Sequence, residues 1–598
     1  MEQLNEENTV VVHDACRGAW LLFSKPEKIL EATSVESVLT VLYDTDRIVR
    51  DKNKFAAGFV SYEASPAFDS AFPVKEDSGF PLAWFGIFSE PRVIAFGDFP
   101  RPDAGTLVWE PSITREEYSG AIRRIKDYLR EGDTYQVNYT FRLRSNFEKN
   151  PLGLFTRMLE AQQGGYGAFI NTPDWVICSA SPELFFELSD RKLVSRPMKG
   201  TAPRRPGYES DLREAAILGH CEKNRAENLM IVDMVRNDMG RISDTGSVCV
   251  PELYEVEKYP SMWQMTSTVC SRTDAGLAEI FRALFPPASI TGAPKARTME
   301  IISELESSPR RIYTGSIGFL SPDGAARFNV AIRTVLIDKF KKSAEFGVGG
   351  GIVWDSADNA EFEECMTKAS ILTRPAPEFS LLETMLWEPG SGYSLLDRHL
   401  ERLSRSASYF DRKVNIGALR ERLVETARSM AAEPCLVRLI VPETGEPSIE
   451  KRMAPSRPGK PYCLCIAHAP VDSGNPFLYH KTTYRPVYEE ALAASPGYDD
   501  VLLFNDRGEI TESCRANVVV EMNGRLLTPP VSSGILPGVY RSELLEQGRI
   551  EEKVIGVKDL ARCSKVYLIN SVRGMWEVII DEARQENEEG ALTACKRL

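Results

Sequence analysis

Hydrophobic and polar positions alternate between helical and strand-like spacing along the chain in no regular order. The sequence contains no internal repeat and no low-complexity tract, which argues against a solenoid. Residues 222–238 predict a helix whose apolar side chains are not confined to one narrow stripe, so its polar side chains need partners. Residues 361–372 predict a second helix, and Pro375 and Pro377 prevent it from continuing.

This proline-containing connector divides the chain. We predict one domain at 1–374 and a second at 375–598, which is long enough for its own core. Residues 452–459 predict a loop or subdomain joint inside the second domain. The longest apolar runs, such as 229–232, are far shorter than the roughly 20 residues that cross a bilayer, so we expect no membrane association.

Composition and charge narrow the class of protein. The 598 residues are 43% hydrophobic and 26% charged, which is typical of a globular chain. Lys and Arg number 72 against 85 Asp and Glu, a net charge of −13, and no segment concentrates the basic residues. We therefore expect no nucleic-acid partner. The acidic N-terminus lacks the features of a signal peptide, which predicts a cytoplasmic protein.

Cysteine and histidine offer little for metal or nucleophilic chemistry. The 12 cysteines are scattered without a Cys-x-x-Cys pair, and Cys463 and Cys465 are spaced as on one face of a strand. We expect reduced thiols. The five histidines are isolated in the sequence. Lysine and carboxylate chemistry are therefore the better candidates.

Two acidic side chains share one face of the helix predicted at 361–372. Glu361 and Glu364 are three residues apart, where like charges destabilise a helix by about 0.2–0.5 kcal/mol unless something neutralises them. A hard divalent cation with oxygen ligands would do so. Taken alone, such a pair is more often a solvated surface, so its meaning depends on the motifs around it.

Six motifs of the first domain resemble, in their order, those of the chorismate-utilising enzymes, and most closely the large component of aminodeoxychorismate synthases. The resemblance covers about residues 55–374. It implies an α+β fold with two large antiparallel sheets packed together and helices outside. Glycine-rich turns also suit an anionic substrate, because backbone N–H groups can approach it. The motifs are GDTYQVN (132–138), SASPE (179–183), PMKGT (197–201), SITGAPK (289–295), GSIG (315–318) and GVGGGIV (347–353).

The resemblance implies a site for chorismate, which carries two carboxylates. An arginine such as Arg333 can grip a carboxylate bidentately. The positions that match substrate-binding residues of the family are Thr291, Gly292, Tyr313, Arg333, Gly349 and Gly351. Those that match its Mg²⁺ ligands are Glu227, Glu361 and Glu364.

Lys199 separates two branches of this family. Anthranilate synthases usually carry Ala here, whereas aminodeoxychorismate synthases carry Lys. The resemblance implies that Lys199 attacks ring carbon 2 of chorismate while the hydroxyl at carbon 4 departs, and that ammonia then adds at carbon 4. A nucleophilic lysine must be neutral, which desolvation and nearby cations favour, and Arg196 is close in sequence. Glu183 matches the general acid/base of the family.

Two positions depart from the family pattern. Gln264 stands where many relatives have His, and an amide cannot transfer a proton near neutral pH, which weakens an anthranilate synthase interpretation. Asn224 stands where relatives often have an acidic residue, so it is not assigned as a metal ligand. The Leu-Leu-Glu-Ser signature of tryptophan feedback is absent near the N-terminus, and the similar letters at 381–384 are a coincidence. We expect no inhibition by tryptophan.

Three motifs of the second domain resemble those of the fold-type IV pyridoxal-phosphate enzymes, which include branched-chain and D-amino-acid aminotransferases and aminodeoxychorismate lyase. The motifs are HKTTYR (480–485), GEITESCRANVVV (508–520) and SGILPGVYR (533–541), and the match covers about residues 380–580. The resemblance implies two α/β subdomains with pyridoxal 5′-phosphate between them, and a homodimer. Arg438 and Tyr484 are candidates for substrate selection that the sequence does not assign.

The roles of single residues follow from the same resemblance. Lys481 is the Schiff-base lysine that shuttles protons, and Glu512 pairs with the pyridine nitrogen. The positions that match contacts to the cofactor ring and phosphate are Arg402, Leu536, Val539, Tyr540 and Ser571. Backbone N–H groups at the start of a helix, as at 539–540, are suited to a phosphate.

The joining of the two domains predicts two consecutive reactions. The first makes aminodeoxychorismate from chorismate and ammonia, and the second eliminates pyruvate to give 4-aminobenzoate for folate synthesis. No glutaminase is recognisable in the chain, so ammonia comes from solution or from a separate glutamine amidotransferase. One alternative is an anthranilate synthase joined to a branched-chain or D-amino-acid transaminase. Another is that the second domain is a non-catalytic binding or dimerisation module.

Overall fold

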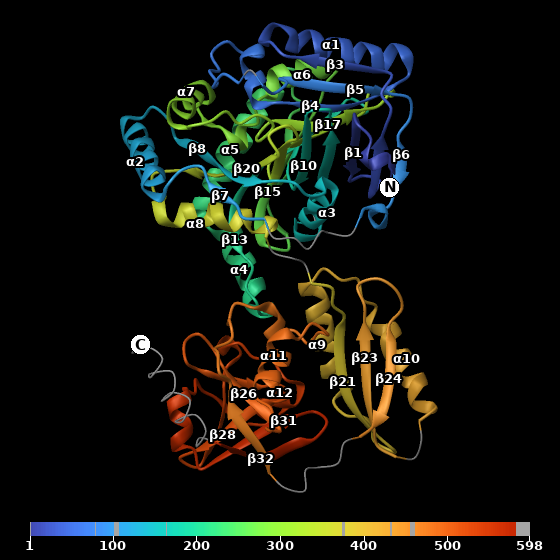
Figure 1. The fold of residues 1–598 in the computed structure, drawn as a ribbon, viewed down its shortest axis with the longest axis vertical. Helices are drawn as coiled ribbons and strands as arrows, with labels where there is room; N and C mark the ends of the chain where they lie inside the picture. Colours follow the sequence, from blue (N-terminus) through green and yellow to red (C-terminus); the bar gives the residue numbers. More distant parts are fainter. Residues whose placement is uncertain are drawn as a thin grey trace. The chain divides into compact units, whose positions relative to one another are not determined.

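The structure, a computed structural model, falls into two compact units (Figure 1). The first comprises residues 1–203 and 215–376, and the second comprises residues 204–214 and 377–598. The predicted boundary at 374/375 lies outside the described residues, and the assignment of 204–214 to the second unit has no signal in the sequence pattern. The described residues are 2–77, 79–100, 107–162, 164–373, 377–430, 433–454 and 461–581.

Two ten-stranded antiparallel sheets form the first unit. One contains β1 (Thr9–Asp14), β2 (Ala19–Phe23), β6 (Arg92–Ile94), β7 (Glu110–Pro111), β8 (Gln136–Asn146), β9 (Tyr166–Asn171), β10 (Trp175–Ser181), β16 (Gly292–Ala293), β19 (Thr334–Asp338) and β20 (Ser343–Ile352). The other contains β3 (Lys28–Ala32), β4 (Phe55–Val60), β5 (Ala83–Phe88), β11 (Leu184–Ser189), β12 (Lys192–Arg196), β13 (Met198–Pro203), β14 (Cys249–Lys258), β15 (Met262–Arg272), β17 (Ser316–Leu320) and β18 (Ala326–Val330).

These two sheets pack face to face, with helices on their outer faces. Phe59 of one sheet and Ile170 of the other belong to the core between them. The outer cores pack against α2 (Arg115–Glu131), α3 (Pro151–Gln162) and α8 (Asp358–Ala369) on one side, and α1 (Val35–Lys52), α5 (Glu222–Gly240) and α6 (Leu277–Leu284) on the other. Because many strands are covered on both faces, they are nearly continuously buried, as β15 is. The remaining helices that begin before residue 377 are α4 (Tyr208–His220) and α7 (Lys295–Leu305).

Local capping explains how the chain enters the strand that carries the GDTYQVN motif. The N-terminus of α2 is closed by a capping box, in which the Thr114 hydroxyl accepts the Glu117 N–H at 3.2 Å and the Glu117 carboxylate accepts the Thr114 N–H at 2.7 Å. Gly132 ends the helix with a left-handed φ of 82°. After residues 133–135 the chain enters β8, which carries the last three residues of the GDTYQVN motif.

The second unit has two sheets, each with its own core. Antiparallel β21 (Leu381–Glu388), β22 (Gly392–Tyr393), β23 (Cys435–Val441) and β24 (Ser448–Met453) pack against α9 (Leu396–Tyr409) and α10 (Ile416–Arg428). The second sheet is mixed and contains β25 (Tyr462–Ile466), β26 (Asp500–Phe504), β27 (Ile510–Ser513), β28 (Asn517–Met522), β29 (Arg525–Thr528), β30 (Glu551–Glu552), β31 (Lys565–Asn570) and β32 (Gly574–Ile580), with α11 (Pro486–Ala494) and α12 (Val539–Glu546).

This architecture confirms the predicted α+β fold, with two packed antiparallel sheets in the first unit and two subdomains in the second. The helices predicted at 222–238 and 361–372 are α5 and α8, the latter continued by a short 3₁₀ turn to Leu372. Every cysteine within the described residues is a free thiol, as expected. No helix within those residues has the length and apolar character needed to cross a membrane.

Candidate active sites

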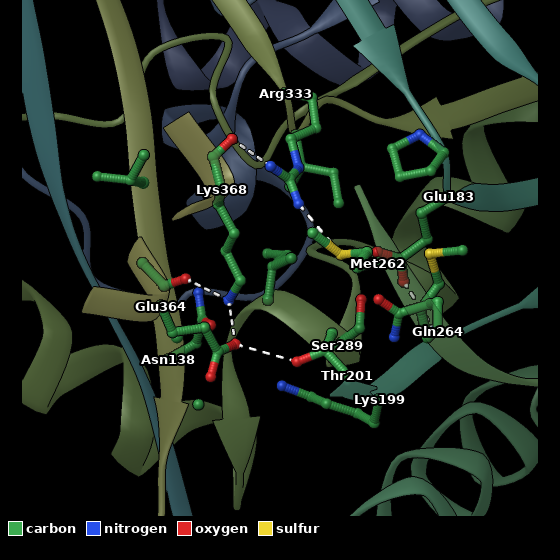
Figure 2. A pocket seen from close by; sticks show the side chains of 18 of the residues that line it. Asn138, Glu183, Lys199, Thr201, Met262, Gln264, Ser289, Arg333, Glu364 and Lys368 are labelled. Atoms are coloured by element: carbon green, nitrogen blue, oxygen red, sulfur yellow. Dashed lines mark hydrogen bonds and ion pairs between the residues drawn. The ribbon is translucent and has the colours of Figure 1, made fainter. Parts of the chain in front are cut away.

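A cavity of about 210 Å³ in the first unit brings together most of its predicted site residues. Side chains from strands of both sheets and from α5 and α8 line it (Figure 2). Two predicted residues do not line the cavity: Thr291 and Gly292 are buried beside β8, where the Thr291 carbonyl accepts the N–H of Asn138 at 2.7 Å. Asn138 itself reaches the cavity. The predicted residues that line it are Glu183, Lys199, Glu227, Tyr313, Arg333, Gly349, Gly351, Glu361 and Glu364.

Lys199 is half-buried on β13, and its side chain points into the same space as Glu364 and Lys368 (Figure 2). Burial lowers the pKa of Lys199; the nearby Glu227 carboxylate opposes this shift, while the ammonium of Lys368 reinforces it. Arg196, considered above as an activating cation, instead hydrogen-bonds Glu255 at 2.9 Å and pairs with Glu257. The cation that favours a neutral Lys199 is therefore Lys368.

Glu183 lies between β10 and β11 and is buried. Burial raises its pKa to about 7, although hydrogen bonding to Ser289 and the positive charge of Lys199 act in the opposite direction. The N–H of Met198, the residue before Lys199, donates to the Glu183 carboxylate at 3.4 Å. A carboxyl with this pKa carries a proton part of the time near neutral pH, which a general acid requires.

Arg333 presents a buried positive charge at the cavity. Its guanidinium donates to the Lys368 carbonyl and, at 3.5 Å, to the sulfur of Met262 (Figure 2). It makes no ion pair with an acidic side chain of the described residues, and burial lowers its pKa to about 10. Its φ of 52° is left-handed, an uncommon conformation for a residue with a Cβ. A buried, uncompensated guanidinium is suited to an anionic ligand.

All three predicted metal ligands line the cavity. Glu364 pairs with Lys368 at 2.8 Å, and the charge of Lys368 lowers the pKa of Glu364. Burial raises the pKa of Glu227, and the charges of Glu361 and Glu364 raise it further. No three His, Cys, Asp or Glu side chains among the described residues are already gathered as a metal site. The carboxylates fit Mg²⁺ by chemistry, because hard oxygen ligands with mutually repelling charges favour such a cation.

The glycines of β20 make room for this arrangement. A Cβ on Gly351 would lie 2.9 Å from the Lys199 Nζ and 2.1 Å from the Gln136 Nε2. A Cβ on Gly347 would lie 2.2 Å from the ring of Tyr313. Gln136 is buried, and both polar atoms of its amide lack a partner within the described part of the chain. Sequence reasoning assigned no role to Gln136, although it is part of the GDTYQVN motif.

Lys481 is the centre of the corresponding site in the second unit. It follows the buried His480, and its carbonyl accepts the N–H of Leu382 on β21 at 3.0 Å. Burial lowers the pKa of Lys481 to about 8, and the charges of Arg402 and Arg485 act in the same direction. A neutral amine is therefore available near neutral pH, as carbonyl condensation requires.

Glu512 is buried at the end of β27 with both carboxylate oxygens hydrogen-bonded. The Tyr488 hydroxyl donates to one at 2.7 Å, and the Asn517 amide donates to the other at 2.9 Å. Burial raises the pKa of Glu512 to about 7, against the effect of the Tyr488 hydrogen bond. A Cβ on Gly538 would lie 1.9 Å from the Asn517 Oδ1, so a glycine is needed in the PG turn before α12.

Arg402 is held by a buried carboxylate that the sequence did not single out. Glu383 of β21 accepts two hydrogen bonds from Arg402, at 2.9 and 2.6 Å, and its oxygen lies 2.6 Å from Nδ1 of His399. Despite burial, the charges of Arg402 and His399 lower the pKa of Glu383 to about 2. Arg402 also donates to the Pro537 carbonyl at 3.3 Å. The segment 381–384 thus contributes the carboxylate that contacts Arg402 and His399.

Three of the other predicted cofactor contacts lie at the turn before α12 and the start of that helix, and the fourth, Ser571, lies beside β21. Val539 and Tyr540 are the first residues of α12, and Leu536 and Pro537 lead into that helix. Ser571 follows β31, and its hydroxyl donates to the Thr384 carbonyl at 3.4 Å. A lysine amine, a buried carboxylate, an arginine and a helix start meet the chemical needs of pyridoxal phosphate: a carbonyl, a ring nitrogen and a phosphate.

Two regions of the chain match known protein families. Residues 97–374 match the family described as chorismate binding enzyme, and residues 380–579 match amino-transferase class IV. The chain thus contains regions similar to two enzyme families. It is 41% identical over 272 residues to aminodeoxychorismate synthase component 1 of Salmonella typhimurium, covering 45% of this chain and 60% of that protein.

Anthranilate synthases are similar as well. The chain is 36% identical over 281 residues to anthranilate synthase component 1 1 of Haloarcula marismortui, covering 47% of this chain and 57% of that protein. The crystal structure of anthranilate synthase component I from Streptococcus pneumoniae TIGR4 aligns with a TM-score of 0.51 at 25% identity, covering 62% of this chain and 91% of that one. This chain thus spans less than two thirds of each curated relative.

Proposed function

We propose that this protein converts chorismate to 4-aminobenzoate in two steps. The chorismate-binding unit replaces the hydroxyl at ring carbon 4 with an amino group, releasing water and giving aminodeoxychorismate. The class IV unit, with pyridoxal phosphate, then eliminates pyruvate to give 4-aminobenzoate for folate synthesis. The 41% identity to an aminodeoxychorismate synthase component supports the first step. The class IV match and the site around Lys481 support a cofactor-dependent second step.

The observation that carries the proposal is a lysine amine with a lowered pKa inside the chorismate-binding cavity. A neutral Lys199 can form a bond to ring carbon 2 of chorismate while the bond from carbon 4 to its hydroxyl breaks. Glu183, with a pKa of about 7, donates the proton that leaves with the hydroxyl as water. Ammonia then adds at carbon 4, and the bond between Lys199 and carbon 2 breaks.

Charged groups around Lys199 would hold the substrate. Arg333 is a buried cation without an acidic partner within the described residues, so a substrate carboxylate would supply its missing counter-charge. Mg²⁺ would be held by Glu227, Glu361 and Glu364 and would neutralise the ring carboxylate. The ion would also offset the repulsion by Glu361 and Glu364, which adds to burial in raising the pKa of Glu227.

In the class IV unit, pyridoxal phosphate would supply an electron sink when bound to Lys481. Arg402 and the start of α12 would bind its phosphate, and Leu536 would pack against its ring. Glu512, held by Tyr488 and Asn517, would keep the ring nitrogen protonated. The Lys481 amine would accept the proton at ring carbon 4 of the substrate.

Partners and location complete the proposal. The curated relative is named component 1, which indicates a second component, and we infer that a separate glutamine amidotransferase supplies ammonia. A homodimer of the class IV unit and a cytoplasmic location are further parts of the proposal.

The decisive experiment incubates the purified full chain with chorismate, ammonium, Mg²⁺ and pyridoxal phosphate and identifies the products by mass and retention. We expect 4-aminobenzoate and pyruvate in equal amounts. A Lys481→Ala variant should stop at aminodeoxychorismate. Formation of anthranilate would contradict the assignment of Lys199. Accumulation of aminodeoxychorismate by the unaltered chain would contradict the lyase assignment, and amino-group transfer to pyruvate would identify a transaminase instead.

A further inference from the structure

Residues 204–214 belong to the second unit by their contacts, although they lie inside the region that matches the chorismate-binding family. They directly follow β13, the strand that carries Lys199. The sequence gives no reason to connect this segment with pyridoxal phosphate chemistry. Its contacts within the second unit, however, lead to the residue that precedes Lys481.

The segment is folded around a buried ion pair of its own. Arg204 pairs with Asp211 at 2.8 Å, and both side chains are less than one tenth exposed. The Arg205 N–H also donates to the Asp211 carboxylate at 2.8 Å, and the Asp211 N–H donates to the Gly207 carbonyl at 2.9 Å. These bonds hold the Asp211 carboxylate in place, and the carboxylate in turn orients the Arg204 guanidinium.

Arg204 then packs on an aromatic ring at the end of α9. Its guanidinium lies 4.5 Å from the centre of the Tyr409 ring and donates to the Tyr409 carbonyl at 3.0 Å. The ring of Tyr409 in turn stacks on His480, with ring centres 4.2 Å apart and planes tilted by 30°. Arg204, Tyr409 and His480 thus form a continuous column of planar groups.

The His480 side chain is buried and contacts several neighbouring side chains in this unit. Its Nδ1 lies 3.0 Å from the Ser406 hydroxyl, and its ring also packs at 5.0 Å against Phe410. Burial lowers the pKa of His480 to about 3, against the effect of the Pro206 backbone. The His480 ring is therefore neutral at physiological pH. Arg204 is then the one cation of the column, and no second positive charge repels it.

We propose that residues 204–214 are a positioning segment of the second site, in which Arg204 acts through Tyr409 and His480 to fix the backbone of Lys481. On the other side of Lys481, its carbonyl is held by the N–H of Leu382. Lys481 is thus held on both sides, and one of the two supports comes from residues that lie outside the class IV match at 380–579. The cofactor part of this inference rests on the proposed function.

The test uses the full-length chain with Arg204→Met and, as a matched control, Arg205→Met. Arg205 is the next residue and pairs with Glu214 on the surface at 2.8 Å. We expect Arg204→Met to weaken pyridoxal phosphate binding about tenfold, because a partly desolvated cation–π contact and its hydrogen bond are lost. Hydrogen–deuterium exchange at 479–483 without cofactor should also become several-fold faster. Arg205→Met should change neither value.

Further variants separate the proposal from simple misfolding. Tyr409→Phe keeps both ring contacts and should behave like the unaltered chain, whereas Tyr409→Leu should reproduce Arg204→Met. Arg204→Lys keeps a positive charge for Asp211 but loses the planar stack, and an intermediate effect is expected. Unchanged exchange at 479–483 in Arg204→Met would overturn the inference. Absence of cofactor binding by the unaltered chain would contradict the proposed function instead, while the exchange measurement still decides the positioning role.

Discussion

The two sites each centre on a lysine with a lowered pKa, but their surroundings differ. Lys199 lies among carboxylates, with Glu227, Glu183 and Glu364 all favouring its charged form, so burial is the main cause of its lowered pKa. Lys481 has two arginines, Arg402 and Arg485, whose charges add to the effect of burial. At Lys199, burial and the charge of Lys368 thus act against three carboxylates, whereas at Lys481 burial is reinforced by two arginine charges and opposed by Glu383 and Glu512.

The largest expected effect comes from removing the first lysine. Lys199→Ala should lower the rate of chorismate amination by about 10³-fold or more, because bond formation at ring carbon 2 is lost. Binding of chorismate should persist, since Arg333 and the glutamates remain. The measurement is product formation with ammonium, together with a binding titration.

Lys223→Ala is the matched control, because Lys223 also lines the cavity, and it should stay within a few-fold of the unaltered chain. Full activity of Lys199→Ala would remove the covalent mechanism.

A second test addresses the arginine that distinguishes the Lys481 site. Glu383→Gln keeps the size of the side chain but removes the negative charge that holds Arg402 and His399. We expect pyridoxal phosphate to bind about 10- to 100-fold more weakly, because a buried guanidinium without its counter-charge leaves its position. Equilibrium binding followed by absorbance measures this. Amination of chorismate in the same variant is the internal control and should not change. Unaltered cofactor affinity would show that Arg402 does not need Glu383.

Some residues of the two sites could be predicted from the sequence and others could not, for a physical reason. Lys199 and Lys481 lie in local motifs whose order along the chain is informative, and so do the glycines of β20 that make space for Lys199. Glu383 and Tyr488 act only because folding brings them to Arg402 and Glu512, and nothing in their own neighbourhoods signals it. Lys368 is intermediate, since it follows Glu364 by four residues on one helix, where an ion pair is expected. The grouping of 204–214 with the second unit has no local signal at all.

Crowding at the first lysine can be tested with the glycines of β20. Gly351→Ala would place a methyl group 2.9 Å from the Lys199 amine and against the Gln136 amide. We expect kcat/KM for amination to fall about 10- to 100-fold, because misplacement of a nucleophile by about 1 Å has effects of that size. Gly350→Ala is the comparison, since its nearest neighbour is Glu361 at 3.2 Å, and its loss should be smaller at saturating Mg²⁺. Equal losses in both variants would indicate a general effect on β20.

The smallest expected effect concerns the hydroxyl that holds Glu512. The Tyr488 hydrogen bond stabilises the ionised carboxylate and so lowers the pKa of Glu512, which burial has raised to about 7. Tyr488→Phe removes this bond, and the pKa of Glu512 should rise. Because the ionised form is needed to hold a protonated ring nitrogen, cofactor affinity should begin to fall at a higher pH as the solution is acidified, by a few tenths of a unit to one unit. Cofactor binding between pH 6 and 9 measures the shift.

Tyr393→Phe, which loses a hydroxyl bonded to the Leu423 carbonyl in the other subdomain, should leave the profile unchanged. A shift in the opposite direction would mean that Tyr488 stabilises the protonated carboxyl, and Glu512 would then not be the ionic partner of the ring nitrogen.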